Sequence, residues 1–164
     1  MQKTHLQCRE CKKEYDPTFK YICDECFGPL DVHYDFPTLT KNTFVNREQT
    51  YWRYFELLPI TDKSNIVSIN AGMTPLVKAE KLGKEIGLNN LYIKNDSVNP
   101  TFSFKDRPAG VAVSKAKEFG LGSVGCASTG NLASATAAHA AKAGFPCYIF
   151  APSDIEHAKI AQAL

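Results

Sequence analysis

The sequence lacks the features of membrane and disordered proteins. No apolar run approaches the roughly 18 residues that a membrane-spanning helix needs, and the opening residues, MQKTHLQCRE, hold no apolar stretch typical of a secretory signal. Apolar residues make up 44% of the 164 residues and charged residues 22%, which excludes intrinsic disorder. We therefore expect a cytoplasmic protein with a packed core and no membrane partner.

An excess of charge of one sign is missing too. The 19 basic and 17 acidic residues leave a net charge of +2, and the basic residues are spread along the chain. A protein that binds nucleic acid usually gathers them on one face. The chain also contains no G-x-G-x-x-G pattern, no P-loop and no Ser-His-Asp set. We expect a small-molecule substrate and no nucleic-acid partner.

Cysteine is the unusual presence. Four of the six cysteines form two Cys-x2-Cys pairs separated by eleven residues, namely Cys8, Cys11, Cys23 and Cys26. Two such turns can place four thiolates around one Zn²⁺ ion. Two disulfides or four free thiols are the alternatives, and disulfides are disfavoured in a reducing compartment. Because four thiolates leave no position for water, the predicted zinc is structural.

The chain divides into three parts. Residues 1–35 are predicted to be a zinc-ribbon-like module that the metal would fold, since so short a segment cannot build its own core. Residues 36–72 form a connecting segment, with a helix over 46–58 and a short strand over 65–70. Residues 73–164 alternate between strands and helices, and we expect them to be the N-terminal part of a longer, truncated domain.

The alternation in the third part predicts an α/β fold. The expected strands cover residues 91–94, 123–127 and 146–151. The expected helices cover residues 78–86, 107–119 and 132–143, with a last helix opened by a capping box of Ser153 and Glu156. Strands that alternate with helices build a doubly wound parallel sheet with helices on both faces, here an incomplete one.

Lys105 is the first candidate functional residue. It follows the expected strand 91–94 and directly precedes a helix, and open parallel sheets bind ligands at the carboxyl ends of their strands. The positive end of a helix dipole disfavours a charged amine there, and a neutral amine is the nucleophile in imine formation. A surface lysine paired with Asp106 is the alternative interpretation.

The second candidate is the loop of Ser128, Thr129, Gly130 and Asn131, which follows the expected strand 123–127 and leads into a helix. Small residues let a ligand approach the backbone, and the N–H groups that open a helix attract anions such as a carboxylate or a phosphate. An ordinary helix cap without a ligand is the alternative.

Together these segments resemble a known family. Residues 99–107, Asn-Pro-Thr-x-Ser-Phe-Lys-Asp-Arg, resemble the lysine motif of the fold-type-II pyridoxal-phosphate enzymes, the tryptophan synthase β-like family. Residues 52–59, the Gly-x-Thr-Pro-Leu turn at 72–76 and the loop at 127–131 resemble the threonine synthases within it. An N-terminal cysteine ribbon also occurs in a subset of these proteins.

The resemblance implies roles for individual residues. Lys105 would hold pyridoxal 5'-phosphate as a Schiff base, with Phe104 packed near the ring. Asn131 would hydrogen-bond the 3′-oxygen of the cofactor, while Ser128 and Thr129 would hold the substrate α-carboxylate. The implied reaction is the lyase reaction of threonine biosynthesis, in which O-phospho-L-homoserine and water give L-threonine and phosphate. The full-length protein would be a homodimer.

The sequence departs from the family pattern at two positions beside the lysine. Phe102 stands where glycine is frequent, and Pro108 follows the motif. The glycine-rich loop for the cofactor phosphate does not lie within these residues. Other enzymes of the family, such as cysteate synthase or threonine dehydratase, stay open as alternatives. A zinc-ribbon binding module on a catalytically silent α/β domain is the alternative from another class.

Overall fold

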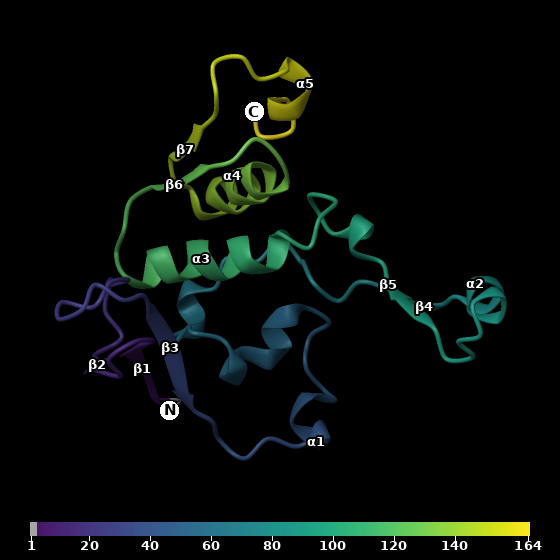
Figure 1. The fold of residues 1–164 in the computed structure, drawn as a ribbon, viewed down its shortest axis with the longest axis horizontal. Coiled ribbons are helices and arrows are strands. Elements are labelled where there is room, and N and C mark those ends of the chain that lie inside the picture. The colour runs from purple at the N-terminus through teal and green to yellow at the C-terminus, as the bar shows by residue number, and fades with distance from the viewer. Residues whose placement is uncertain (1–2) are drawn as a thin grey trace.

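The computed structural model describes residues 3–164. Figure 1 shows helix α3 (Asp106–Glu118) across the middle of the molecule. Helix α4 (Asn131–Ala143) and the strands β6 (Val124–Ala127) and β7 (Cys147–Phe150) lie on one side of it, and the N-terminal sheet and the connecting segment lie on the other. No helix within the described range is long and apolar enough to cross a membrane.

The N-terminal sheet has three antiparallel strands in the order β2-β1-β3. They are β1 (Lys3–Cys8), β2 (Glu14–Tyr15) and β3 (Leu30–Asp35). Few apolar side chains are buried here: Leu6, Cys8 and Cys23 are the buried hydrophobic residues of this part. Packing alone therefore contributes little to its stability, as the length of the segment predicts.

The connecting segment is less regular than its sequence predicts. It contains α1 (Lys41–Phe44) and the 3₁₀ helices η1 (Tyr51–Leu57) and η2 (Lys63–Asn65). The helix expected over 46–58 is thus shorter and is kinked at Tyr54. The strand expected over 65–70 was wrong. Val67 N–H donates to the buried Ser114 Oγ at 2.8 Å, so a side chain of α3 takes the place of a strand partner.

Helix α3 confirms the expected helix over 107–119 to within one residue at each end. Pro108 occupies its third position, where no intrahelical N–H bond is lost. Gly120 follows with a φ of +70°, a conformation that glycine adopts without strain. The connecting segment packs beside this helix through a core of four buried residues: Tyr51, Trp52, Ile60 and Ala71.

Strands β6 and β7 pair in parallel, with α4 between them in the chain. This confirms the predicted β-α-β unit. The expected doubly wound three-stranded sheet is wrong in one respect: β5 (Tyr92–Lys94) does not join this pair. It pairs antiparallel with β4 (Leu76–Lys78) instead. Strand β4 begins at the last residue of the Gly-x-Thr-Pro-Leu turn, and the sequence pattern did not predict it.

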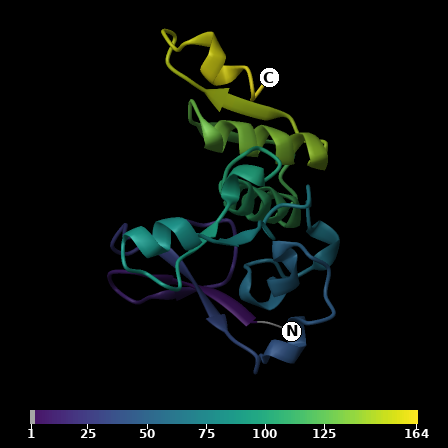
Figure 2. The same cartoon turned by 90° about the vertical axis from the view of Figure 1, so that its right-hand side faces the viewer.

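Helix α2 (Glu80–Glu85) connects β4 to β5, and the three elements form an arm that projects from the molecule in Figure 1. Figure 2 shows α3 nearly end-on and α4 lengthwise, so the two packed helices cross. Helix α4 packs against β6 and β7. The alternate residues Tyr148 and Phe150 of β7 are exposed on the opposite face. Within the described residues, that face therefore lacks the second layer of helices that a doubly wound fold requires.

The last predicted helix is shorter than expected. Helix α5 spans only His157–Ile160, and Ser153 lies in the turn before it. Ile155 N–H donates to the Pro152 carbonyl at 3.3 Å. This turn uses the backbone around Ser153, so the expected capping box does not open the helix.

Candidate functional site

The loop before α3 is held from within by Asp106. This residue is fully buried, and its carboxylate accepts hydrogen bonds from Thr101 N–H at 2.8 Å and from Thr101 Oγ1 at 2.9 Å. Ser103 Oγ accepts a bond from the Lys105 N–H at 3.2 Å. Because Asp106 is engaged with Thr101, it does not pair with Lys105, which removes the alternative interpretation of that lysine.

A second set of bonds fixes the loop to the turn at residues 72–74. Arg107 donates two bonds of 2.8 Å to the Asp96 carboxylate and a third of 2.7 Å to the Gly72 carbonyl. Thr74 Oγ1 donates to Asp96 at 2.7 Å. The Arg107 guanidinium lowers the pKa of Asp96 to about 2. Arg107 thereby joins the lysine loop to the turn before β4.

Asn99 completes this scaffold. It is almost fully buried, its Oδ1 accepts from Gly72 N–H at 3.0 Å, and its Nδ2 donates to the Asp96 carbonyl at 3.2 Å. Sequence reasoning assigned no role to Asn99, Asp96 or Thr74. The one signal in the sequence for this contact was that the lysine motif and the Gly-x-Thr turn occur in the same chain, which suggests that the two segments serve one site.

Lys105 itself is half-buried at the N-terminus of α3. Its Nζ lies 4.7 Å from the centre of the Phe104 ring. Among the side chains and backbone groups that the structure describes, Lys105 Nζ has no ion-pair or hydrogen-bond partner. The structure thus holds the backbone of Lys105 rigidly and leaves its amine free, an arrangement that suits covalent attachment of a carbonyl compound.

Phe102 explains one departure from the family pattern. Its φ is +59°, in the left-handed region, and its side chain is 71% exposed. Glycine adopts this conformation at no steric cost, whereas a bulky residue is strained there. The loop geometry therefore accounts for the preference for glycine at this position in the family that the motif resembles.

The loop of residues 128–131 lies where it was predicted, between the carboxyl end of β6 and the start of α4. Ser128 and Thr129 are half-buried and Asn131 is exposed, and Ser128 Oγ accepts from Gly130 N–H at 3.4 Å. No hydrogen bond or ion pair between described residues joins this loop to Lys105. The predicted roles of these residues stay predictions.

Three residues bridge the segments that carry these two loops, and the sequence pattern assigned a role to none of them. His139 of α4 is fully buried, and its Nδ1 lies 3.9 Å from Asp106 Oδ1. Tyr51 of η1 and Gly110 of α3 lie beside it. Burial lowers the pKa of His139 and raises the pKa of Tyr51, so both side chains are neutral near pH 7.

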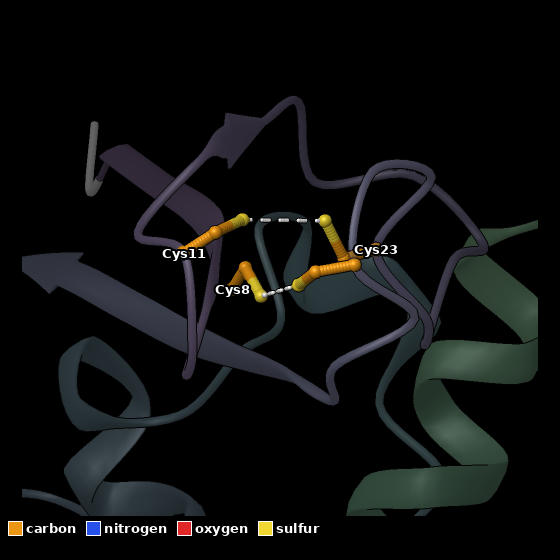
Figure 3. Close-up of side chains that lie close together, drawn as sticks. Cys8, Cys11 and Cys23 are labelled. Atoms are coloured by element: carbon orange, nitrogen blue, oxygen red, sulfur yellow. Dashed lines mark hydrogen bonds between the residues drawn. The ribbon is translucent and has the colours of Figure 1, made fainter.

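The cysteines form a separate cluster. The Sγ atoms of Cys8, Cys11, Cys23 and Cys26 all lie within 4.8 Å of one another. Cys8 Sγ lies 3.4 Å from Cys26 Sγ, and Cys11 Sγ lies 3.5 Å from Cys23 Sγ. Figure 3 draws both contacts as dashed lines, with Cys8, Cys11 and Cys23 labelled. A disulfide is about 2.05 Å long, so all four are free thiols. Tetrahedral zinc with bonds of about 2.3 Å would separate the sulfurs by about 3.8 Å, which fits this cluster.

The backbone repeats itself around the two Cys-x2-Cys pairs. Lys12 N–H donates to the Cys8 carbonyl at 3.1 Å, and Phe27 N–H donates to the Cys23 carbonyl at 3.1 Å. Lys12 and Phe27 both have a positive φ, of 64° and 58°. The Tyr15 hydroxyl lies 3.0 Å from Cys23 Sγ, and this hydrogen bond lowers the pKa of Cys23 to about 6. Both turns thus present their thiols toward one point.

Comparison with known proteins decides the family. The family described as "Pyridoxal-phosphate dependent enzyme" matches residues 67–164, which include Lys105 and the 128–131 loop. The chain belongs to this family. The structure is also similar to that of the processed form of threonine deaminase isoform 2 from Solanum lycopersicum, with a TM-score of 0.52 and 26% identity over 77% of this chain and 36% of that one. The α/β architecture is that of this family.

Within this family, the chain is similar to threonine synthases. Threonine synthases of Methanocaldococcus jannaschii and Methanosarcina acetivorans are each 42% identical to this chain, over 96% and 98% of its length. Threonine synthase of Halalkalibacterium halodurans is 45% identical over 68% of the chain and 31% of its own length. The chain spans about two fifths of the length of the first two relatives, which is 40% in each case.

Proposed function

We propose that this chain is part of a threonine synthase, which converts O-phospho-L-homoserine and water into L-threonine and phosphate. One observation carries the proposal: a lysine with a free amine stands on a rigidly bonded loop at the start of α3. That loop lies in a chain that is 42% identical to two threonine synthases over nearly its whole length.

Lys105 would hold pyridoxal phosphate and move protons at Cα and Cβ of the substrate. The cofactor, when bound, supplies an electron sink for carbanion chemistry. The exposed Phe104 ring beside the amine would pack near the cofactor ring. The hydrogen bonds of Asp106 and Ser103 would keep the backbone of the lysine loop fixed during the reaction.

The 128–131 loop would bind the substrate. The hydroxyls of Ser128 and Thr129 and the free N–H groups at the start of the 13-residue helix α4 would hold the substrate α-carboxylate. The side-chain amide of Asn131 would donate to the 3′-oxygen of the cofactor. Helix α4 begins at this loop and thereby places its hydroxyls and N–H groups. The helix also packs against α3, which begins directly after Lys105.

Borohydride trapping followed by peptide mass spectrometry tests this assignment. The protein is mixed with pyridoxal phosphate and reduced, and we expect the cofactor on Lys105, with the labelling lost in Lys105→Ala. Lys78→Ala, which removes an exposed lysine near Glu80 on the arm, is the matched control and should label normally. Labelling that survives in Lys105→Ala would refute the proposal.

The reaction needs its own test, since the structural neighbour is a threonine deaminase. In the full-length protein we expect phosphate release from O-phospho-L-homoserine with formation of threonine. Ammonia release from threonine without any phosphate release would instead identify a deaminase. Sulfite-dependent phosphate release from a phosphorylated serine would identify a cysteate synthase.

For the N-terminal part we propose a structural Zn²⁺ bound by the four cysteines. The thiol cluster and its two matching turns support this site, and four thiolates close it to substrate. We propose residues 1–35 as the zinc-ribbon-like module, 36–72 as the connecting segment and 73–164 as the N-terminal part of the cofactor domain.

The remaining proposals concern the whole protein. We propose a cytoplasmic homodimer with no nucleic-acid or membrane partner, on the resemblance to the family and on the balanced charge of 19 basic and 17 acidic residues. Sedimentation of the full-length protein tests the dimer, and retention on DNA-cellulose tests the absence of nucleic-acid binding.

A further inference from the structure

Two buried polar atoms near the lysine loop have no hydrogen-bond partner among the described residues. They are Tyr51 Oη and His139 Nε2. Tyr51 is 7% exposed and His139 is fully buried. A buried donor or acceptor without a partner is costly, so each such atom needs an explanation.

Both atoms face the same point on α3. A methyl group at Gly110 would lie 2.2 Å from Tyr51 Oη and 2.8 Å from His139 Nε2. The two atoms are therefore at most about 5 Å apart, a separation that one bridging water molecule spans and that a small side-chain shift reduces to a direct hydrogen bond. Only glycine leaves room for them, which gives Gly110 a role although glycine lowers helix propensity.

The neighbouring bonds decide which atom donates. His139 Nδ1 lies 2.9 Å from the Ala135 carbonyl, which can only accept, so the proton of the neutral ring is on Nδ1. His139 Nε2 is then an acceptor, and the Tyr51 hydroxyl is the available donor. Asp106, 3.9 Å from Nδ1, already accepts two bonds from Thr101.

We propose that Tyr51 donates a hydrogen bond to His139 Nε2 across Gly110, directly or through one water, and that this clamp positions Lys105. The clamp joins η1, α3 and α4 at Gly110, five residues after Lys105, and it thereby sets the distance from the lysine to the 128–131 loop. Tyr51, Gly110 and His139 are positioning residues, not catalytic ones. The effect on Lys105 rests on the proposed function, whereas the hydrogen bond itself does not.

Nuclear magnetic resonance of protein labelled with ¹⁵N-histidine tests the bond. We expect one neutral ring protonated on Nδ1, which His139→Gln removes. In Tyr51→Phe the Nε2 resonance of that ring should move downfield, because it loses its donor. Tyr54→Phe, which changes the half-exposed tyrosine of the same 3₁₀ helix, is the control and should leave it in place. An unchanged Nε2 resonance in Tyr51→Phe would overturn the clamp.

Reductive trapping of pyridoxal phosphate on Lys105 tests the positioning, in variants shown to be folded by circular dichroism. Tyr51→Phe and Gly110→Ala should need at least fivefold more cofactor for half-labelling. Tyr54→Phe and Gly122→Ala should match the wild type, since a methyl at Gly122 meets no atom within 4 Å.

The outcomes separate the two claims. Normal trapping in both Tyr51→Phe and Gly110→Ala would overturn the positioning role while the proposed function stands. If the wild type traps no cofactor, the proposed function fails and the positioning role fails with it. The hydrogen bond is then still decided by the Nε2 resonance.

Discussion

At the scale of single residues, the lysine motif divides into groups that face inward and groups that face outward. Asn99, Thr101, Ser103 and Asp106 are buried and bonded to the backbone or to one another. Phe102 and Phe104 are exposed, and Lys105 is half-buried. The inward groups leave few conformations to the loop, so the outward groups are presented in a fixed place.

The Asp96–Arg107 pair predicts a sensitivity to acid. The pKa of Asp96 is about 2 in the folded protein, below its ordinary value of 3.8, because Arg107 donates to the carboxylate. Its stabilisation is therefore complete above about pH 4 and is lost as the pH falls toward 2. We expect Asp96→Asn to lower the free energy of unfolding at pH 7 by about 1–2 kcal/mol.

Urea unfolding between pH 2 and pH 7 measures this effect. The difference in unfolding free energy between wild type and Asp96→Asn should shrink as the pH falls through this window. Asp154→Asn, which changes an exposed carboxylate, should follow the wild type at each pH. A difference that is the same at pH 7 and pH 2.5 would show that the ion pair does not cause it.

The sequence singled out Lys105 and Phe104 among the outward residues and assigned no role to the inward ones. Lys105 could be found because a lysine between a strand and a helix is unusual, and the structure shows its amine free. The contact of Tyr51 with Gly110 and His139 could not be found, because it joins three segments that lie 29 to 88 residues apart in the chain. Local patterns carry no information on such packing.

At the scale of elements, the sequence predicted long segments with a clear hydrophobic period correctly and failed on short ones. The 13-residue helices α3 and α4 and the parallel strands β6 and β7 lie close to where the sequence predicted them. The three-residue strand β4 is too short to show a period of two, and its partner β5 was assigned to the wrong sheet. The segment 65–70 looked like a strand because it is apolar, and its residues Ile66 and Ile69 pack against the buried core around Tyr51 and Trp52.

The N-terminal sheet predicts a dependence on metal. Because Leu6 and two cysteines are its only buried hydrophobic residues within the described range, zinc would supply most of its stability. We expect one zinc ion per chain. Its removal by a chelator, or the substitution Cys23→Ser, should lower the hydrogen-exchange protection of the β1 and β3 amides by at least about tenfold.

Metal analysis and hydrogen exchange of the same samples measure the two quantities. Cys126→Ser is the matched control, since Cys126 lies on β6, outside the cluster, and should leave both the zinc content and the exchange unchanged. Protection in α3 and α4 should survive zinc removal because their packing involves no cysteine of the cluster. A metal-free protein with full protection in β1 would contradict the zinc-dependent fold.

At the scale of the whole molecule, the apolar surface is distributed unevenly. Helix α4 packs on one face of β6 and β7, while Tyr148 and Phe150 on the other face are 59% and 67% exposed. Leu76, Val77, Tyr92 and Ile93 of the projecting arm are exposed as well. Exposed aromatic and aliphatic side chains on a sheet face of this kind are typical of an interface.

The 164-residue chain on its own should therefore bind a hydrophobic dye and associate as its concentration rises. Phe150→Ser and Tyr148→Ser remove aromatic surface from one open sheet face, so each should lower both the fluorescence of bound anilinonaphthalene sulfonate and the weight-average mass in sedimentation. Val45→Ser, at an exposed position directly after α1 and away from β6, β7 and the arm, should change neither. Equal dye binding in the wild type and in both aromatic variants would show that the open face of β6 and β7 is not the surface that binds.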